Sequence, residues 1–183
     1  IRSVVVRTPL HHADALEEEL GGEIRLKLES LQRTGSFKIR GAYNFVAQMS
    51  GSERAKGIIT YSSGNHAQAV ALAAHLHGIR AVVVMPVTAT DVKIKGSARL
   101  GAEVILEGTT SLDRKVMAES IAEAEGLSIV PPFDHMDIIA GQGTVGIEIA
   151  EDWEDFDTVL LPIGGGGLCG GSAAALRRLK PEV

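Results

Sequence analysis

Short runs of apolar and β-branched residues recur along the chain and predict strands at 24–29, 57–61, 80–85, 103–107, 127–130 and 157–162. Between these runs, apolar residues repeat every three or four positions, which is typical of amphipathic helices. The predicted buried faces are Ala67, Val70, Ala71 and Ala74 in residues 64–77, and Val116, Ile121 and Ala124 in residues 111–125. Strands that alternate with helices predict parallel βαβ units and an α/β fold.

Two segments are predicted to cross between two lobes. Residues 49–57 are polar and contain glycine, and residues 130–135 contain paired prolines that stiffen the chain. They bracket about three strand-helix pairs, so we predict a small inserted α/β domain at 57–134. A larger domain would then combine residues 1–50 and 135–183.

The position of the predicted strands also locates the candidate site. Ligands in open α/β sheets bind beyond the carboxyl ends of strands. The loops after Glu29, Tyr61 and Pro162 are therefore the candidates.

Composition and charge narrow the possible partners. The net charge is −5 and no basic block is present, so neither nucleic acid nor an anionic membrane is predicted as a partner. No apolar run approaches the roughly 20 residues of a membrane span. Cys169 is the only cysteine, which excludes an internal disulfide and fits a reducing cytoplasm. We expect it to be a small buried apolar residue.

A run of four glycines follows the last predicted strand and precedes the predicted helix at 172–180. Without side chains, the backbone N–H groups of residues 163–171 can converge on a phosphate, helped by the helix N-terminus behind them. The alternative is a flexible turn, but a turn rarely needs so many glycines directly before a helix. The run therefore predicts a phosphate site.

The glycine patterns of the chain do not meet the requirements of known nucleotide-binding motifs, which narrows the kind of phosphate ligand. The pattern G-x-G-x-x-G occurs at 165–170 and again at 141–146, which shows how weak it is alone. A dinucleotide fold needs it after the first strand, with an acidic residue about 20 positions later. Neither occurrence meets that condition, and no P-loop pattern exists. A single phosphate group on a small cofactor or substrate remains.

Lys38 lies two residues after a serine, at the start of a predicted helix. If Ser36 is the N-cap, Phe37 and Lys38 are the first helical residues. The partial positive charge of the helix N-terminus opposes the ammonium form there, so the neutral amine is easier to reach. A neutral lysine amine forms Schiff bases with carbonyl compounds, whereas the alternative is an ordinary solvated lysine.

Residues 60–69 follow a predicted strand and open a helix with small polar side chains. Ser62, Ser63 and Asn65, with the free N–H groups of the turn, could hold a carboxylate. The same residues could simply cap the helix, and both roles are compatible. His66 could act as a base, but we prefer a packed, hydrogen-bonded structural role.

Four motifs in this order, TGSFKIRGAYN, SSGNHAQA, AGQGT and GGGGL, resemble the fold-type II pyridoxal-phosphate enzymes, and most of all the serine/threonine dehydratases and serine racemases. The resemblance runs from about Thr8 to Val183 and implies two lobes built on parallel or mixed open sheets of the tryptophan synthase β-like type. It implies Lys38 as the Schiff-base lysine and Phe37 packed against the cofactor ring. The implied cofactor-binding residues are Phe37, Lys38, Asn65, Gly164, Gly165, Gly166, Gly167 and Leu168, with Asn65 near the pyridine 3′-oxygen. The implied carboxylate-binding residues are Ser62, Ser63, Gly64, Asn65 and His66.

The resemblance implies a reaction on a small amino acid. Lys38 would remove the α-proton, and loss of a β-hydroxyl group from a substrate such as L-serine or L-threonine would lead to a 2-oxo acid and ammonia. Return of the proton from the opposite face, with Ser63 as the acid, would instead give racemisation. A non-catalytic fragment or amino-acid-binding module is the third alternative.

The resemblance also implies residues that this sequence does not contain. In the family, the partner of the pyridine nitrogen and the acidic ligands of a divalent cation lie beyond the position of Val183. The chain is therefore expected to be a fragment of a longer enzyme, truncated at its C-terminus. Homodimerisation is a further expectation from the family.

Overall fold

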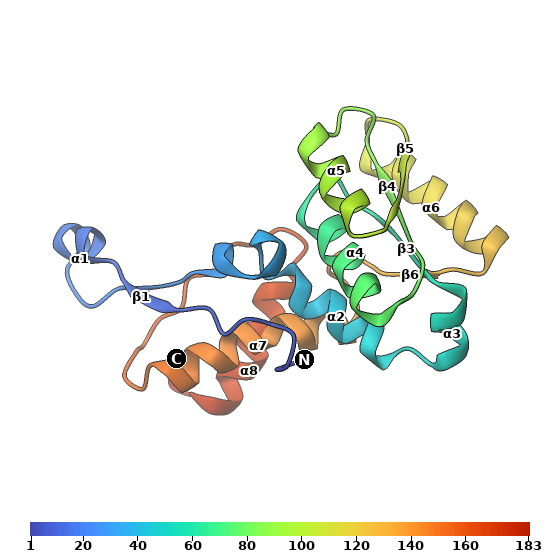
Figure 1. Cartoon of the computed structure of the whole chain (residues 1–183). Coiled ribbons are helices and arrows are strands. Elements are labelled where there is room, and N and C mark those ends of the chain that lie inside the picture. The colour runs from blue at the N-terminus through green and yellow to red at the C-terminus, as the bar shows by residue number, and fades with distance from the viewer.

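The computed structural model describes residues 1–183 and contains two sheets (Figure 1). β1 (Leu10–His12) and β2 (Arg25–Lys27) form an antiparallel pair. The second sheet is entirely parallel, in the order β5-β4-β3-β6, from the strands β3 (Ile58–Tyr61), β4 (Ala81–Met85), β5 (Glu103–Leu106) and β6 (Ser128–Ile129).

Eight α-helices and two short 3₁₀ turns complete the chain. The 3₁₀ turns are η1 (Glu29–Leu31) and η2 (Arg33–Gly35). The helices are α1 (Asp14–Leu20), α2 (Lys38–Gln48), α3 (Gly51–Lys56), α4 (Asn65–His77), α5 (Asp91–Arg99), α6 (Ser111–Glu125), α7 (Met136–Asp152) and α8 (Gly167–Leu179). The alternation of parallel strands and helices confirms the predicted α/β fold class.

Helices cover both faces of the four-stranded sheet. Val82 and Val84 of β4 pack on one face with Ala118 and Ala122 of α6. Val83 and Met85 point to the other face, where the buried alanines of α4 pack against them. Because both faces are covered, β4 is apolar throughout rather than alternating. The predicted α4 face of Ala67, Val70, Ala71 and Ala74 is buried as expected.

The helices α2, α7 and α8 pack together beside the part of the chain that contains the parallel sheet. α7 and α8 lie side by side in the lower part of Figure 1, and α2 contacts both α7 and α4. α2 therefore links the α7–α8 pair to α4, which packs on the sheet. The proposed boundaries of the two domains, at 57 and 134, stay a prediction.

The predicted strand at 157–162 is wrong. Residues 157–163 have no regular secondary structure, and Leu160 is 91% exposed. A strand needs a neighbouring backbone to accept and donate its hydrogen bonds, and no strand lies beside this segment in residues 1–183. An apolar run therefore did not suffice to make a strand here.

One helix was not predicted, and one predicted helix face needs correction. Residues 51–56, within the predicted crossing at 49–57, form α3, because Ser50 and Glu53 make a complete capping box. The buried face of α6 is carried by Ala118 and Ala122, while Val116 is 57% exposed and Ala124 is exposed. Small side chains let α6 approach the sheet closely, and the helix turns these alanines inward.

No helix of the structure combines the length and the apolar character that crossing a membrane requires.

Candidate active site

Lys38 is the first residue of α2, and its amine is partly buried. Nζ donates a hydrogen bond of 2.6 Å to the carbonyl oxygen of Pro132 and lies 5.3 Å from the centre of the Phe37 ring. Burial lowers the pKa of Lys38 below its ordinary value. The amine therefore loses its proton more readily than that of a solvated lysine, and the cause is burial rather than the helix N-terminus from which the sequence predicted the same direction.

The predicted cap of this helix is wrong. Phe37 occupies the N-cap position in helical conformation, and no side chain caps the helix. Ser36 is extended, and its buried hydroxyl has no hydrogen-bond partner. Phe37 packs against a small apolar cluster that Val145 and Ile149 of α7 form with Leu168 of α8.

His66 and Lys38 contact the same short segment of the chain, residues 130–132. The imidazole is buried; Nε2 lies 3.2 Å from the carbonyl oxygen of Val130, two residues before the carbonyl that binds Lys38. Burial lowers the pKa of His66 to about 4, the Val130 hydrogen bond opposes this, and the charge of Lys38 adds to it. The packed, hydrogen-bonded role expected of His66 matches this environment, and Nδ1 has no partner.

The loop between β3 and α4 presents unused backbone donors. The N–H groups of Ser63, Asn65, His66 and Ala67 donate no backbone hydrogen bond, whereas Gly64 donates to the Ser62 hydroxyl at 3.2 Å. Ser63 and Asn65 are exposed. Free N–H groups at a helix N-terminus can bind a carboxylate. The structure thus brings this loop, Lys38 and His66 into one neighbourhood.

The four glycines end in the first turn of α8, which begins at Gly167 rather than at residue 172 as predicted. None of the N–H groups from Gly164 to Cys169 donates a hydrogen bond to another backbone carbonyl. Gly166 has a φ of 84°, a conformation that favours glycine and turns the chain into the helix. Six unused donors at one helix N-terminus suit a phosphate group.

Phe133 contacts the glycine loop and directly follows the residue that binds Lys38, a position that no motif in the sequence indicated. A Cβ atom on Gly165 would overlap the Phe133 ring, and one on Gly167 would lie 2.8 Å from the Phe133 carbonyl oxygen. The preceding carbonyl, that of Pro132, accepts the Lys38 hydrogen bond. The amine and the glycine loop therefore meet at adjacent residues. The Leu168 side chain is 9% exposed in the apolar core, which leaves its N–H group for a ligand.

Close backbone contacts on α7 hold the two helices that begin at the site. A Cβ on Gly141 would lie 2.6 Å from the Cα atom of Gly41 in α2. A Cβ on Gly143 would lie 2.8 Å from the carbonyl oxygen of Gly171 in α8. The glycines at 141–146 thus serve helix packing and not nucleotide binding. α7 sets the separation of α2, which carries Lys38, from α8, which carries the glycine loop.

A buried ion network lies behind the same helices. The Arg40 guanidinium is fully buried and donates to Glu29 and to Glu148, the latter at 2.6 and 2.9 Å. Lys27 adds a contact of 2.8 Å to Glu148. Burial alone would raise the pKa of Glu148, but the hydrogen bonds from Arg40 and Lys27 outweigh it and lower that pKa.

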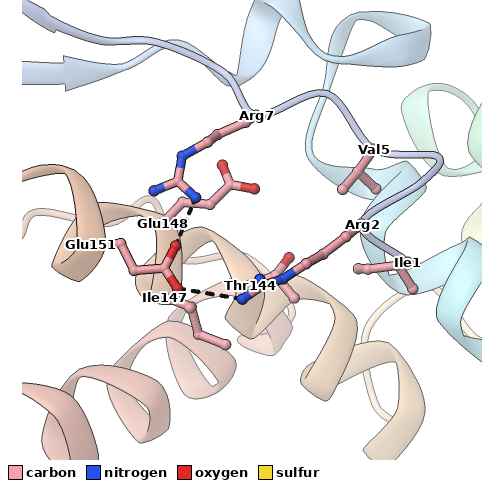
Figure 2. Close-up of a pocket in the computed structure, with 8 residues that line it drawn as sticks. All are labelled: Ile1, Arg2, Val5, Arg7, Thr144, Ile147, Glu148 and Glu151. Atoms are coloured by element: carbon pink, nitrogen blue, oxygen red, sulfur yellow. Dashed lines mark hydrogen bonds and ion pairs between the residues drawn. The ribbon is translucent and has the colours of Figure 1, made fainter.

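A cavity of about 240 Å³ lies elsewhere, between the N-terminal residues and α7 (Figure 2). Arg7 and Arg2 approach Glu151 across it, at 2.7 and 3.4 Å. None of the predicted site residues lines it.

Two further sequence predictions concern single residues and metals. Cys169 is only half-buried, so the expectation of a buried apolar cysteine is wrong; it lies in the first, glycine-rich turn of α8. No group of three or more histidine, cysteine, aspartate or glutamate side chains is arranged to hold a metal ion.

Comparisons with known proteins extend these observations. The family described as "Pyridoxal-phosphate dependent enzyme" matches residues 1–183. An L-threonine ammonia-lyase of Thermotoga maritima is 50% identical over the whole chain, which spans 46% of that protein. The chain thus spans between about a third and a little over half of the length of the curated relatives it matches.

Solved structures agree in fold. The processed form of threonine deaminase isoform 2 from Solanum lycopersicum has a TM-score of 0.96 and 41% identity, and the chain covers 50% of it. Maize serine racemase has a TM-score of 0.97 and 36% identity, with 56% of it covered. Both likenesses include all of this chain. With the family match over every residue, they show that the chain belongs to the fold-type II pyridoxal-phosphate dependent enzymes.

Proposed function

We propose that the protein containing this chain is an ammonia-lyase that removes water and then ammonia from a β-hydroxy amino acid such as L-threonine or L-serine. One observation carries the proposal. The partly buried amine of Lys38, with its lowered pKa, meets the glycine loop at adjacent residues, Pro132 and Phe133. The threonine ammonia-lyase and threonine deaminase among the similar proteins support the same reaction.

The residues present fit pyridoxal phosphate. The unused N–H groups from Gly164 to Cys169 would hold its phosphate, and the Lys38 amine would hold its aldehyde carbon. Phe37 and Asn65 are the proposed neighbours of its ring, although the Phe37 side chain also packs in the apolar core. When bound, the group draws electron density away from the α-carbon of the substrate.

The chain's own groups then account for binding and proton transfer. The loop from Ser62 to His66 would bind the substrate carboxylate through its unused N–H groups. The Lys38 amine would take the proton from the α-carbon, because a lysine of lowered pKa is neutral more often at working pH. The β-hydroxyl group would leave with the proton that Lys38 had taken, forming water, and addition of one water molecule would then release the 2-oxo acid and ammonia.

Borohydride reduction in the presence of pyridoxal phosphate, followed by peptide mapping, tests the lysine. We expect one modified peptide, at Lys38. In a separate assay, the unreduced protein should release 2-oxo acid from L-threonine, L-serine or threo-3-hydroxyaspartate. Lys38→Ala should abolish both, while Lys95→Ala, which alters an exposed lysine paired with Asp91, should change neither. An adduct at any other lysine would refute the assignment.

A racemase is the second candidate, supported by Ser63. Its side chain is exposed, makes no hydrogen bond within the chain and lies on the loop assigned to the carboxylate. The likeness to maize serine racemase supports the same scaffold. Ser63→Ala should stop racemisation of serine and leave water elimination within about threefold, since a lost general acid costs roughly 100-fold or more. Racemisation that survives unchanged would remove Ser63 from this role.

The other expectations remain part of the proposal. A non-catalytic amino-acid-binding role is the third alternative, and turnover by the purified protein would exclude it. We propose a cytoplasmic homodimer, although two of the similar proteins are named as chloroplastic. No residue cluster of this chain supports the divalent cation that the family resemblance suggested.

A further inference from the structure

Lys93 is a partly buried lysine without a partner, and it faces the loop assigned to the substrate carboxylate. It lies in the first turn of α5. Its Nζ atom is 3.9 Å, and its Cε atom 4.0 Å, from the point where a Cβ on Gly64 would lie. Gly64 is the central residue of the loop from Ser62 to His66.

The other lysines of the chain are paired or exposed. Five of the seven form an ion pair with a carboxylate or donate to a backbone carbonyl: Lys27, Lys38, Lys95, Lys115 and Lys180. Lys56 is exposed. Asp91, the acid nearest to Lys93 in the sequence, pairs with Lys95 at 2.9 Å. No carboxylate of the chain pairs with Lys93 in the folded structure.

The surroundings of Lys93 add to the positive potential. The N-termini of α5 and α4 both carry a partial positive charge, and the first turn of α4 has unused N–H groups. Packing of α5 against α4 fixes this arrangement. A Cβ atom added to Gly96 of α5 would lie 3.4 Å from the side chain of Gln68 in α4. The loop itself contains no acidic residue. Two positive helix ends and a lysine without a counter-charge suit an anion between them.

We propose that Lys93 supplies the counter-charge for the α-carboxylate of the amino-acid substrate. This inference rests on the proposed function, because it assigns the loop from Ser62 to His66 to that carboxylate. The loop would provide directional hydrogen bonds, and Lys93 would provide the full charge that uncharged N–H groups lack. Lys93 would thus be a binding residue, with little part in the chemical step.

The test compares two amines that differ by one carboxylate. Glycine and methylamine would be titrated into the protein loaded with pyridoxal phosphate, and binding would be followed by the change in cofactor absorbance. We expect Lys93→Gln to weaken glycine binding about tenfold or more, as loss of a charge-assisted bond does, and to leave methylamine within about twofold. Lys93→Arg, which keeps the charge, should restore most of the glycine affinity.

Lys95→Gln is the matched control, because it alters an exposed lysine of the same helix. It should leave both dissociation constants unchanged. For L-threonine, Lys93→Gln should raise KM by a similar factor and leave kcat within about threefold. Equal weakening of both amines would indicate a structural role and overturn the proposal, as would an unchanged affinity for glycine or no saturable glycine binding at all.

The same measurements separate this inference from the proposed reaction. A protein that binds glycine through Lys93 but releases no 2-oxo acid would refute the ammonia-lyase and retain the carboxylate site. A protein that turns over L-threonine with the same KM after Lys93→Gln would refute the carboxylate site alone.

Discussion

At the scale of single residues, the site depends on two basic side chains that are kept away from water. Lys38 and His66 both contact carbonyl groups of the short segment between β6 and α7. Burial lowers the pKa of each, and the positive charge of Lys38 lowers that of His66 further. This segment, whose Phe133 also contacts the glycine loop, therefore orders both basic groups.

Buried neutral His66 should make the folded protein sensitive to acid. Its pKa falls to about 4 on folding, against 6.5 for a free histidine, so the unfolded chain binds the proton first. Stability should fall as pH decreases from about 6.5 to about 4, by up to about 3 kcal/mol from this group. Urea unfolding at several pH values measures this loss.

His66→Gln should flatten the dependence on pH over that interval. His75→Gln is the control, because His75 is an exposed histidine on the same helix, and this variant should keep the slope of the original protein. A slope that survives His66→Gln would show that other groups cause the acid sensitivity.

At the scale of elements, α7 sets the distance between the two helices that begin at the site, α2 and α8. Its glycines let α2 approach at Gly141 and α8 approach at Gly143, so three helix backbones come into contact. α2 begins with Lys38, and α8 begins within the glycine loop. The distance between amine and phosphate loop is therefore set by backbone contacts, without any flexible side chain between them.

A methyl group at Gly143 should disturb the phosphate loop more than the lysine. Gly143→Ala would push α8 from α7 and cost about 1–3 kcal/mol of stability, as overpacking commonly does. Affinity for pyridoxal phosphate should fall about tenfold, while affinity for pyridoxal, which lacks the phosphate, should change little. Equilibrium titration of both compounds gives the comparison.

Gly170→Ala is the matched control, because nothing lies within 4 Å of a Cβ at that position of α8. It should leave both affinities unchanged. Equal losses for pyridoxal and pyridoxal phosphate in Gly143→Ala would argue against a specific effect on the loop.

At the scale of the whole molecule, one buried ion network joins segments far apart in the sequence. Glu29, Arg40 and Glu148 connect the N-terminal region, α2 and α7, and Lys27 adds a fourth charge. The guanidinium is fully buried and bound by two carboxylates, so the loss of either one leaves an incompletely neutralised charge away from water. The network should therefore determine how α2 sits on α7.

Glu148→Gln should destabilise the protein by about 3–5 kcal/mol, because it leaves buried Arg40 and Lys27 without full compensation. Arg80→Gln, which breaks exposed ion pairs with Glu103 and Glu125, should cost much less, because water already screens those charges. Chemical denaturation of both variants supplies the comparison. Similar losses from the two would mean that the buried network contributes no more than a surface pair.

The sequence alone determined the features that depend on near neighbours. Five of the six predicted strands correspond to strands of the structure, and α4 buries the predicted face. The position of Lys38 in a first helical turn, and the four ordered motifs, also followed from local pattern and family resemblance. These features are set by propensity, side-chain periodicity and helix ends, which act over a few residues.

Which of these segments come into contact depends on the packing of the whole chain. Lys38 contacts Pro132, 94 positions away, and Phe133 covers Gly165, so no local pattern could predict either contact. The apolar run at 157–162 stays outside any sheet because a strand depends on a neighbour for its hydrogen bonds. The glycines of α7 match a nucleotide pattern in sequence, and their real role is visible only where other helices press against them.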